Sequence, residues 1–271
     1  MRVAALISLR RPSFSRRRER RRFAFGAGVE SAVSTAVLFS FTFLGHSTFL
    51  FRTTTGKRLL VDPWLETNPA CPPEFRGFNA VRELDLMLLT HGHRDHTADA
   101  VGIARATGAQ VIAPYELAVW LEEKGLKRVA AMNPGGTRSS LGLTITMVQA
   151  VHSSSIEDET PPRYAGVASG YVIRFEHGLT IYYAGDTALF GDMRTIGEIY
   201  RPSIAFLPIG DVYTMGPEHA AIACAMLGVK DVVPMHYGTF PELTGTPEKL
   251  RQLVSAAGVR VIELAPGDSF D

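Results

Sequence analysis

Hydrophobic and polar residues alternate over some segments of the chain and follow helical spacing over others. Alternation begins in "LFSFTFLG" at residues 38–45, and "HSTFLFRTTTGKRLLVDP" at 46–63 continues it as a hairpin with a Thr-Gly turn. Further strands are predicted at 84–90 and 109–114, and amphipathic helices at 97–108 and 115–125. The first half therefore alternates strands with helices.

The second half of the chain repeats this plan. Strands are predicted at 140–152, 168–186, 204–210, 229–236 and 259–270, of which 168–186 is a hairpin that turns at Glu-His-Gly (176–178), and helices are predicted at 216–228 and 246–258. Two successive halves of strands covered by helices predict an α/β fold, a four-layer αββα sandwich. Polar residues follow several of these strands, so we expect the functional site at the edge of the sheets.

Composition agrees with a folded protein that buries a sizeable core. The 271 residues are 46% hydrophobic and 20% charged, and no apolar run is long enough to cross a membrane. The two cysteines, Cys71 and Cys224, provide neither a disulfide framework nor a CxxC pair. We expect a cytoplasmic protein that does not associate with membranes.

The charge is unevenly distributed along the chain. Residues 1–22 hold nine arginines against a single acid, Glu19, whereas the remaining 249 residues hold 26 acidic against 19 basic side chains. We predict a basic, disordered extension over residues 1–38 and a folded domain over 39–271. The extension could be dispensable, a targeting segment or a binding arm, and the sequence leaves these three open.

The stretch "THGHRDH" at residues 90–96 concentrates candidate metal ligands directly after a predicted buried strand. Four side chains in this one loop offer imidazole nitrogen or carboxylate oxygen, the donors that suit zinc and related ions: His91, His93, Asp95 and His96. Three more candidates each follow the end of another apolar strand: His152, Asp186 and His236. Strand ends hold side chains rigidly while leaving a site open, so we expect all seven to converge.

Seven ligands are enough for two divalent ions. The predicted division gives one ion His91, His93 and His152, gives the other Asp95, His96 and His236, and makes Asp186 the bridge. Zinc is the first expectation, and manganese or iron would accept the same donors. Asp95 is also the predicted catalytic residue, which orients the attacking hydroxide and relays a proton.

Two further residues are candidates for orienting the ligands. His46, in "LGHST", could hold a metal-bound carboxylate, or it could be a histidine whose hydrogen bonds are satisfied at a strand end. Asp62 could hold a ligand histidine, or it could form the turn before Pro63. The aromatic residues Trp64, Phe75 and Phe78 could form an apolar wall of the site or pack in the core.

The motifs "HGHRDH", "YYAGDT" and "MHYGTF", together with "TFLGHSTF", "GVASGYVI" and "FLPIGDVYTMGP", resemble the metallo-β-lactamase superfamily, and within it the UPF0173 or UlaG-like branch of metal-dependent hydrolases. The resemblance runs from about Phe41 to Ser269, and it implies that Thr214 and Met215, in "GDVYTMGP", lie near the metals. True zinc β-lactamases of the commonest type place a cysteine on the second metal, and this chain has none near Asp186. The pattern is more similar to the lactonases, phosphodiesterases and thioesterases of the superfamily.

The expected function is hydrolysis of a small ester, lactone or phosphodiester by a hydroxide that bridges two metal ions. Two alternatives stay open: a nuclease acting on nucleic acid, and an enzyme similar to the mononuclear-iron persulfide dioxygenases. The acidic body argues against a nucleic-acid partner. We expect a small-molecule substrate as the partner, and homo-oligomerisation is left open.

Overall fold

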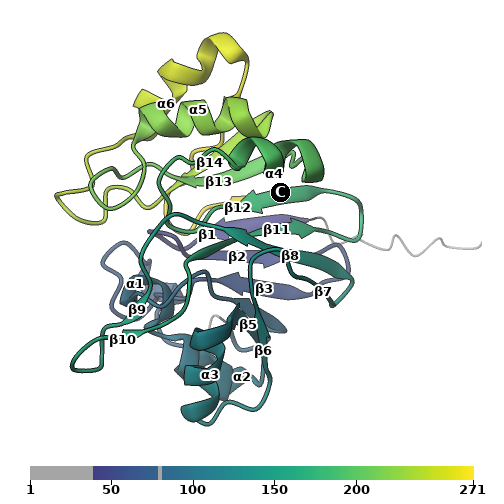
Figure 1. Cartoon of the computed structure of the whole chain (residues 1–271), viewed down its shortest axis with the longest axis vertical. Helices are drawn as coiled ribbons and strands as arrows, with labels where there is room; N and C mark the ends of the chain where they lie inside the picture. Colours follow the sequence, from purple (N-terminus) through teal and green to yellow (C-terminus); the bar gives the residue numbers. More distant parts are fainter. Residues whose placement is uncertain (1–38, 79–80) are drawn as a thin grey trace, which may run out of the picture. The chain divides into compact units, whose positions relative to one another are not determined.

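Two seven-stranded mixed sheets, packed face to face and flanked by helices, make up the part of the chain that the computed structural model describes, residues 39–78 and 81–271 (Figure 1). The predicted αββα sandwich is confirmed. The basic extension predicted for residues 1–38 lies outside the described residues. Within them, no helix has the length and apolar character that crossing a bilayer requires.

The first sheet has the strand order β16-β1-β2-β3-β4-β5-β6. These strands are β1 (Ser40–Phe43), β2 (Phe49–Arg52), β3 (Arg58–Val61), β4 (Leu86–Leu88), β5 (Gln110–Pro114), β6 (Val129–Met132) and β16 (Ser269–Phe270). Strands β1 to β3 form an antiparallel meander, and β3 to β6 run parallel to one another. The carboxyl ends of β3 and β4 therefore lie side by side.

The second sheet has the order β15-β14-β13-β12-β11-β8-β7. Its strands are β7 (Thr137–Ser140), β8 (Leu143–Gln149), β11 (Ser169–Arg174), β12 (Thr180–Tyr183), β13 (Ile204–Pro208), β14 (Asp231–Met235) and β15 (Arg260–Val261). Strands β12 to β15 are parallel, so β12 and β14 end at the same edge. A separate small hairpin joins β9 (Ser155–Ile156) to β10 (Arg163–Tyr164).

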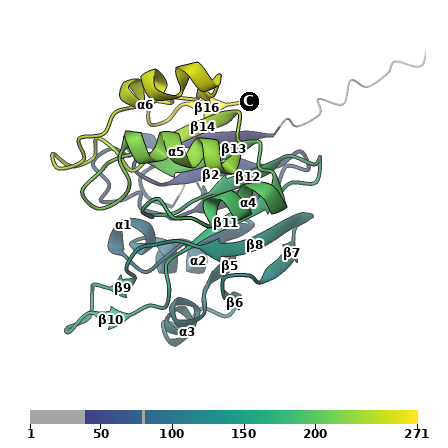
Figure 2. The ribbon, with the colours of Figure 1, turned by 45° about the horizontal axis from the view of Figure 1, so that its top comes forward.

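Helices cover the outer face of each sheet (Figures 1 and 2). The first sheet is covered by α2 (Ala100–Thr107) and α3 (Tyr115–Glu123), with the single-turn α1 (Arg94–Thr97) and the 3-10 turn η1 (Pro73–Phe75) near its edge. The second sheet is covered by α4 (Met193–Tyr200), α5 (Pro217–Leu227) and α6 (Pro247–Val254), which continues into η3 (Ser255–Ala257).

The core between the sheets is largely aromatic. Phe41 and Phe49 from the first sheet place their ring centroids 5.1 and 4.9 Å from that of Phe206 on β13, both with T-shaped geometry. All three rings are fully buried, because the alternating pattern of β1 and β2 turns their phenylalanines toward the second sheet. This interface fixes the sheets relative to each other and therefore fixes the side chains at their ends.

Three hydrogen bonds tie the sheets together beside the predicted ligands. The Ser169 amide donates to the Thr90 carbonyl at 3.0 Å, and the His236 amide donates to the His46 carbonyl at 2.8 Å. The buried Tyr171 hydroxyl donates to the Leu89 carbonyl at 2.7 Å. In each case a residue in a strand of the second sheet, or directly after one, donates to the backbone of a loop of the first sheet.

The structure differs from the predicted elements mainly near the chain's end. The strand predicted at 259–270 is two short strands: β15 pairs with β14 in the second sheet, whereas β16 pairs with β1 in the first. The helix predicted at 97–108 is interrupted because Asp99 turns its carboxylate onto the amides of Leu65 and Glu66, at 2.6 and 3.0 Å. The short elements β6, β7, β9, β10 and α4 were not predicted.

Candidate metal centre

All seven predicted ligands follow the ends of strands at one edge of the two sheets: five lie on loops, and Asp95 and His96 lie on the single-turn helix α1. The first sheet supplies four of them after β4: His91, His93, Asp95 and His96. The second sheet supplies one after each of β8, β12 and β14: His152, Asp186 and His236. The structure brings these side chains into two main groups and a third that overlaps with both, and the donor atoms of each group lie within 4.8 Å of one another. The third group consists of His91, His96 and Asp186.

The first group consists of His91, His93 and His152, as predicted. The Nε2 atom of His91 lies 3.0 Å from Nδ1 of His93. His91 is fully buried, whereas His93 and His152 are partly exposed. Three imidazole nitrogens facing one point form a donor set typical of a zinc site that keeps a coordination position open.

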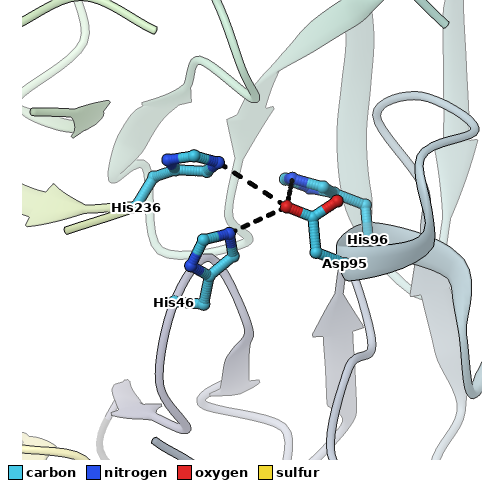
Figure 3. Close-up of side chains that lie close together, drawn as sticks. All are labelled: His46, Asp95, His96 and His236. Atoms are coloured by element: carbon cyan, nitrogen blue, oxygen red, sulfur yellow. Dashed lines mark hydrogen bonds and ion pairs between the residues drawn. The ribbon is translucent and has the colours of Figure 1, made fainter. Parts of the chain in front are cut away.

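The second group contains the predicted Asp95, His96 and His236, and His46 as a fourth member (Figure 3). The Oδ2 atom of Asp95 is the common point of this group. It lies 2.9 Å from Nε2 of His46 and 3.7 Å from Nε2 of both His96 and His236. The Asp95 side chain is 26% exposed, so it also faces the solvent side of the centre.

A single oxygen of Asp186 reaches both groups. Its Oδ2 atom lies 3.7 Å from Nε2 of His152 and 4.0 Å from Nε2 of His91, which belong to the first group. The same atom lies 3.0 Å from Nε2 of His236 and 3.3 Å from Nε2 of His96. This central position is where a bridging carboxylate has to stand.

Asp62 and Thr90 hold His96 from behind. The buried Asp62 carboxylate accepts hydrogen bonds from the Thr90 amide and the Thr90 hydroxyl, both at 2.8 Å. Its Oδ2 atom lies 2.9 Å from Nδ1 of His96, which leaves Nε2 of that ring directed toward Asp186. A carboxylate behind a ligand histidine fixes the tautomer and the orientation of the ring.

His46 contacts Asp95 from the opposite side. Its Nδ1 atom lies 2.9 Å from the Thr239 hydroxyl, its Nε2 atom lies against Asp95, and its ring centroid is 4.0 Å from that of His236. Burial lowers the pKa of His46 to about 4. The geometry is the one predicted for a residue that orients a ligand carboxylate.

Three polar residues of the centre adopt a left-handed backbone conformation that few residues other than glycine tolerate. The φ angles are 59° at His46, 50° at Asp62 and 55° at His236. Such outliers concentrate at functional sites, where the surrounding structure holds them in place. Here the bond from the His236 amide to the His46 carbonyl holds two of the three.

Charges within the cluster are strongly coupled. Although burial opposes the charged form, the histidines His96 and His236 keep the pKa of both Asp95 and Asp186 well below the usual range. Burial likewise opposes protonation of these histidines, but Asp186 and the other nearby carboxylates raise the pKa of His236 to about 9 and that of His96 well above its ordinary value. The deep His91 differs, because burial holds its pKa well below 6.5.

The donor set fits divalent cations. Among the described residues, three buried polar atoms of the centre have no hydrogen-bond partner: Nε2 of His96, Oδ1 of Asp186 and Nδ1 of His236. Buried polar atoms are nearly always satisfied, so the unpartnered Nε2 of His96, which lies among ionised carboxylates, has the chemistry of a ligand for a divalent cation. The seven predicted ligands and a metal pair are thus compatible in position and in chemistry.

A cavity of about 640 Å³ opens directly onto the centre. Ligands from both groups form its floor, and three aromatic side chains line it: Trp64, Tyr213 and Phe240. Its volume lies within the range of about 300–1,000 Å³ that is usual for small-molecule sites. The charged residues at its mouth are Arg94, Glu157 and Glu242.

The expectations for the surrounding loops hold only in part. Trp64 lines the cavity, but Phe75 and Phe78 pack against the core beneath α2 and α3, so a wall role for those two is wrong. Met215 is buried, and its backbone amide donates a hydrogen bond to the carbonyl of Thr187, which follows Asp186 in the chain. Met215 does not line the cavity, whereas Tyr213 of the same loop does. Sequence reasoning also missed Thr90, Thr239 and Phe240, although the last two belong to the "MHYGTF" motif.

Comparison with known proteins gives a consistent result. The protein-family model described as "Beta-lactamase superfamily domain" matches residues 57–237 of the chain. The chain is 47% identical to a UPF0173 metal-dependent hydrolase of Koribacter versatilis over 229 residues, which cover 84% of this chain and 96% of that protein. It is also 47% identical to a UPF0173 metal-dependent hydrolase of Rubrobacter xylanophilus over 232 residues, which are 84% of this chain and 95% of that one.

A solved structure extends the likeness to three dimensions. Igni18, described as a novel metallo hydrolase from the archaeon Ignicoccus hospitalis, superposes with a TM-score of 0.76 at 37% sequence identity. The match covers 86% of this chain and 98% of that chain.

Proposed function

The chain belongs to the UPF0173 metal-dependent hydrolases of the beta-lactamase superfamily, and from this membership we propose that it uses two divalent metal ions to hydrolyse a small ester, lactone or phosphodiester. The observation that carries the proposal is the position of Asp186 Oδ2, within 4.0 Å of histidines from both ligand groups. A carboxylate in that position favours a pair of ions over a single one.

When bound, the cations would lower the pKa of water to near neutrality and polarise the scissile bond. His91, His93 and His152 would hold one ion, Asp95, His96 and His236 the other, and Asp186 both. Asp62 would keep Nε2 of His96 available for ligation by holding Nδ1 of the same ring. The protein itself then need not supply a side-chain nucleophile.

We propose Asp95 as the catalytic residue of the chain. Its carboxylate lines the cavity and its side chain is 26% exposed, so it faces the space where a substrate and water would lie. From this position it orients the attacking water and relays a proton toward the leaving group. The bond from His46 fixes the carboxylate in one orientation, so His46 acts through Asp95 rather than on the substrate.

The test couples metal analysis of the purified protein to turnover of lactones, phosphodiesters and thioesters. We expect two divalent ions per chain, zinc first and manganese or iron as the alternatives, and hydrolysis that a chelator abolishes and added metal restores. A single iron together with oxygen consumption on a thiol substrate would support the persulfide dioxygenase alternative instead. The complete second group of ligands favours the dinuclear hydrolase.

A nuclease is the other alternative. It would need a basic, aromatic-lined path for a strand, whereas the cavity mouth offers Arg94 against Glu157 and Glu242. Measuring RNA binding with and without residues 1–38 separates a nuclease from a small-molecule hydrolase. We propose a small molecule as the partner and the cytoplasm as the compartment.

A further inference from the structure

The walls of the cavity carry information about the substrate beyond the metal centre. Trp64 is buried and held in place: its indole Nε1 donates to the Thr67 hydroxyl at 2.7 Å, and the His46 ring meets it edge-on with centroids 5.2 Å apart. Phe240 lies nearly parallel to it, with centroids 5.8 Å apart and an interplanar angle of 27°. Together they form a rigid aromatic wall next to Asp95.

This wall is partly open to the cavity. Phe240 remains 37% exposed, and Tyr213, which lines the same cavity, is 56% exposed. Aromatic rings left facing a concave site gain free energy when a flat apolar group covers them, through burial and through offset stacking. The wall therefore has the chemistry of a binding surface for a planar group.

The loop that carries Tyr213 is itself unusual. Asp211 and Val212, which precede it, have left-handed φ angles of 68° and 55°. For a β-branched residue such as Val212 this conformation is a genuine outlier. The Asp211 carboxylate holds the turn by accepting a hydrogen bond from the Val212 amide at 2.8 Å. Strain of this kind, next to an exposed aromatic side chain at a cavity mouth, fits a loop shaped to present Tyr213.

The charges at the mouth select against anions. Among the described residues that line the cavity, Arg94 is the one arginine or lysine, whereas Glu157 and Glu242 add two carboxylates beyond the ligands. Within the described part of the chain, none of these three forms an ion pair with another residue. An anionic group bound at the mouth, away from the metal ligands, would usually need several arginine or lysine donors, and the mouth offers one.

We infer that the substrate is an ester or lactone that carries a neutral, planar apolar group, which stacks on the exposed ring of Phe240, and that the buried Trp64 supports this ring from behind. The inference rests on the proposed function and narrows it, because it favours esters and lactones with a neutral apolar substituent over substrates that place a negatively charged group at the cavity mouth. The reacting bond lies over the metal ligands, and the planar group extends toward Phe240 and Tyr213.

The test uses three lactams as hydrolysis-resistant probes and the three matching γ-lactones as substrates. The lactams are pyrrolidin-2-ones substituted at carbon 5 with phenyl, cyclohexyl or 4-carboxyphenyl, and their binding to the metal-loaded protein is measured by calorimetry. We expect phenyl to bind about two- to tenfold tighter than cyclohexyl, because only the flat ring stacks. The 4-carboxyphenyl probe should bind more weakly than phenyl, because its charge meets the acidic mouth.

Two variants and one control connect these preferences to the wall and the mouth. Phe240→Leu keeps an apolar side chain but removes the ring, and it should abolish the preference for phenyl over cyclohexyl. Glu242→Gln should improve binding of the 4-carboxyphenyl probe by about two- to fivefold, as expected for removing one nearby charge in water. Tyr115→Leu removes an exposed aromatic ring outside the cavity and should change neither result.

The outcomes separate this inference from the proposed function. Turnover of the lactones combined with equal or tighter binding of the cyclohexyl or 4-carboxyphenyl probe overturns the inference and leaves the hydrolase proposal standing. The expected order of binding without turnover of any lactone, ester or phosphodiester refutes the proposed function while supporting the stacking wall.

Discussion

Replacing Asp62 tests the support behind the metal centre. Asp62→Asn preserves the left-handed backbone, which asparagine tolerates, and keeps a carbonyl oxygen to accept from the Thr90 amide. Its amide nitrogen, however, takes the position of the oxygen that faces Nδ1 of His96. The histidine must then carry its proton on Nε2, where a metal ion would bind.

The expected magnitudes follow from these contacts. Replacing a charge-assisted hydrogen bond to a buried carboxylate by a reversed bond from a neutral amide should lower the free energy of unfolding by about 1–3 kcal/mol. Metal affinity should fall by about 10- to 100-fold, as is usual when the partner behind a ligand histidine is lost. Asp62→Ala loses all three bonds and adds left-handed strain, so its stability should fall by about 4 kcal/mol or more.

The assay is calorimetric titration of zinc into the metal-free protein, paired with urea unfolding of the same samples. Asp192→Asn, an exposed aspartate outside the site, serves as the matched control and should leave both quantities unchanged. Parental zinc affinity and turnover in Asp62→Asn would show that His96 does not depend on Asp62 for its tautomer, which would refute a role for Asp62 in positioning this ligand.

Three other predictions address the bridge, the protons and the core. Asp186→Ala should lower metal content below that of the parent and reduce kcat by about a hundredfold or more; unchanged metal content by elemental analysis would rule out a bridging role. Because the pKa of His236 is raised from 6.5 to about 9, its stabilising contribution is complete below pH 6.5 and is lost as the pH rises through 9 in the metal-free protein. Ligation needs the neutral ring, so zinc binding at pH 7 should release protons, and calorimetry in two buffers of different ionisation enthalpy that finds no release would contradict this. Phe206→Ala should cost about 3–5 kcal/mol in urea unfolding because the ring is fully buried between the sheets, whereas Ile199→Ala, at an exposed position, should cost little.

The convergence of the seven candidate ligands could be predicted from the sequence because the position of each one depends on a local rule. A polar residue directly after an apolar strand, as at His152, Asp186 or His236, must emerge at the strand's end whatever the rest of the fold does. Layer order was predictable for a similar reason, since the alternation of strands and helices limits the arrangements that bury both faces.

The cavity wall could not be predicted in the same way. Phe240 and Tyr213 lie on irregular loops after β14 and β13, and no periodic pattern shows where such side chains point. Trp64 and Phe78 lie in one loop and looked equivalent in the sequence, yet only Trp64 faces the cavity. The split of the last strand was equally hidden, because an apolar pattern does not reveal which sheet offers the partner.

The candidate ligands follow the ends of strands, whereas the aromatic residues that line the cavity lie on the connecting loops: Trp64, Tyr213 and Phe240. Loop residues tolerate exchange and insertion far better than core strands do. Descendants of this chain could therefore change what they bind by altering a few side chains while their catalytic apparatus stayed intact. Divergence in selectivity among close relatives should accordingly be mapped at positions 64, 213 and 240 before any position in the sheets.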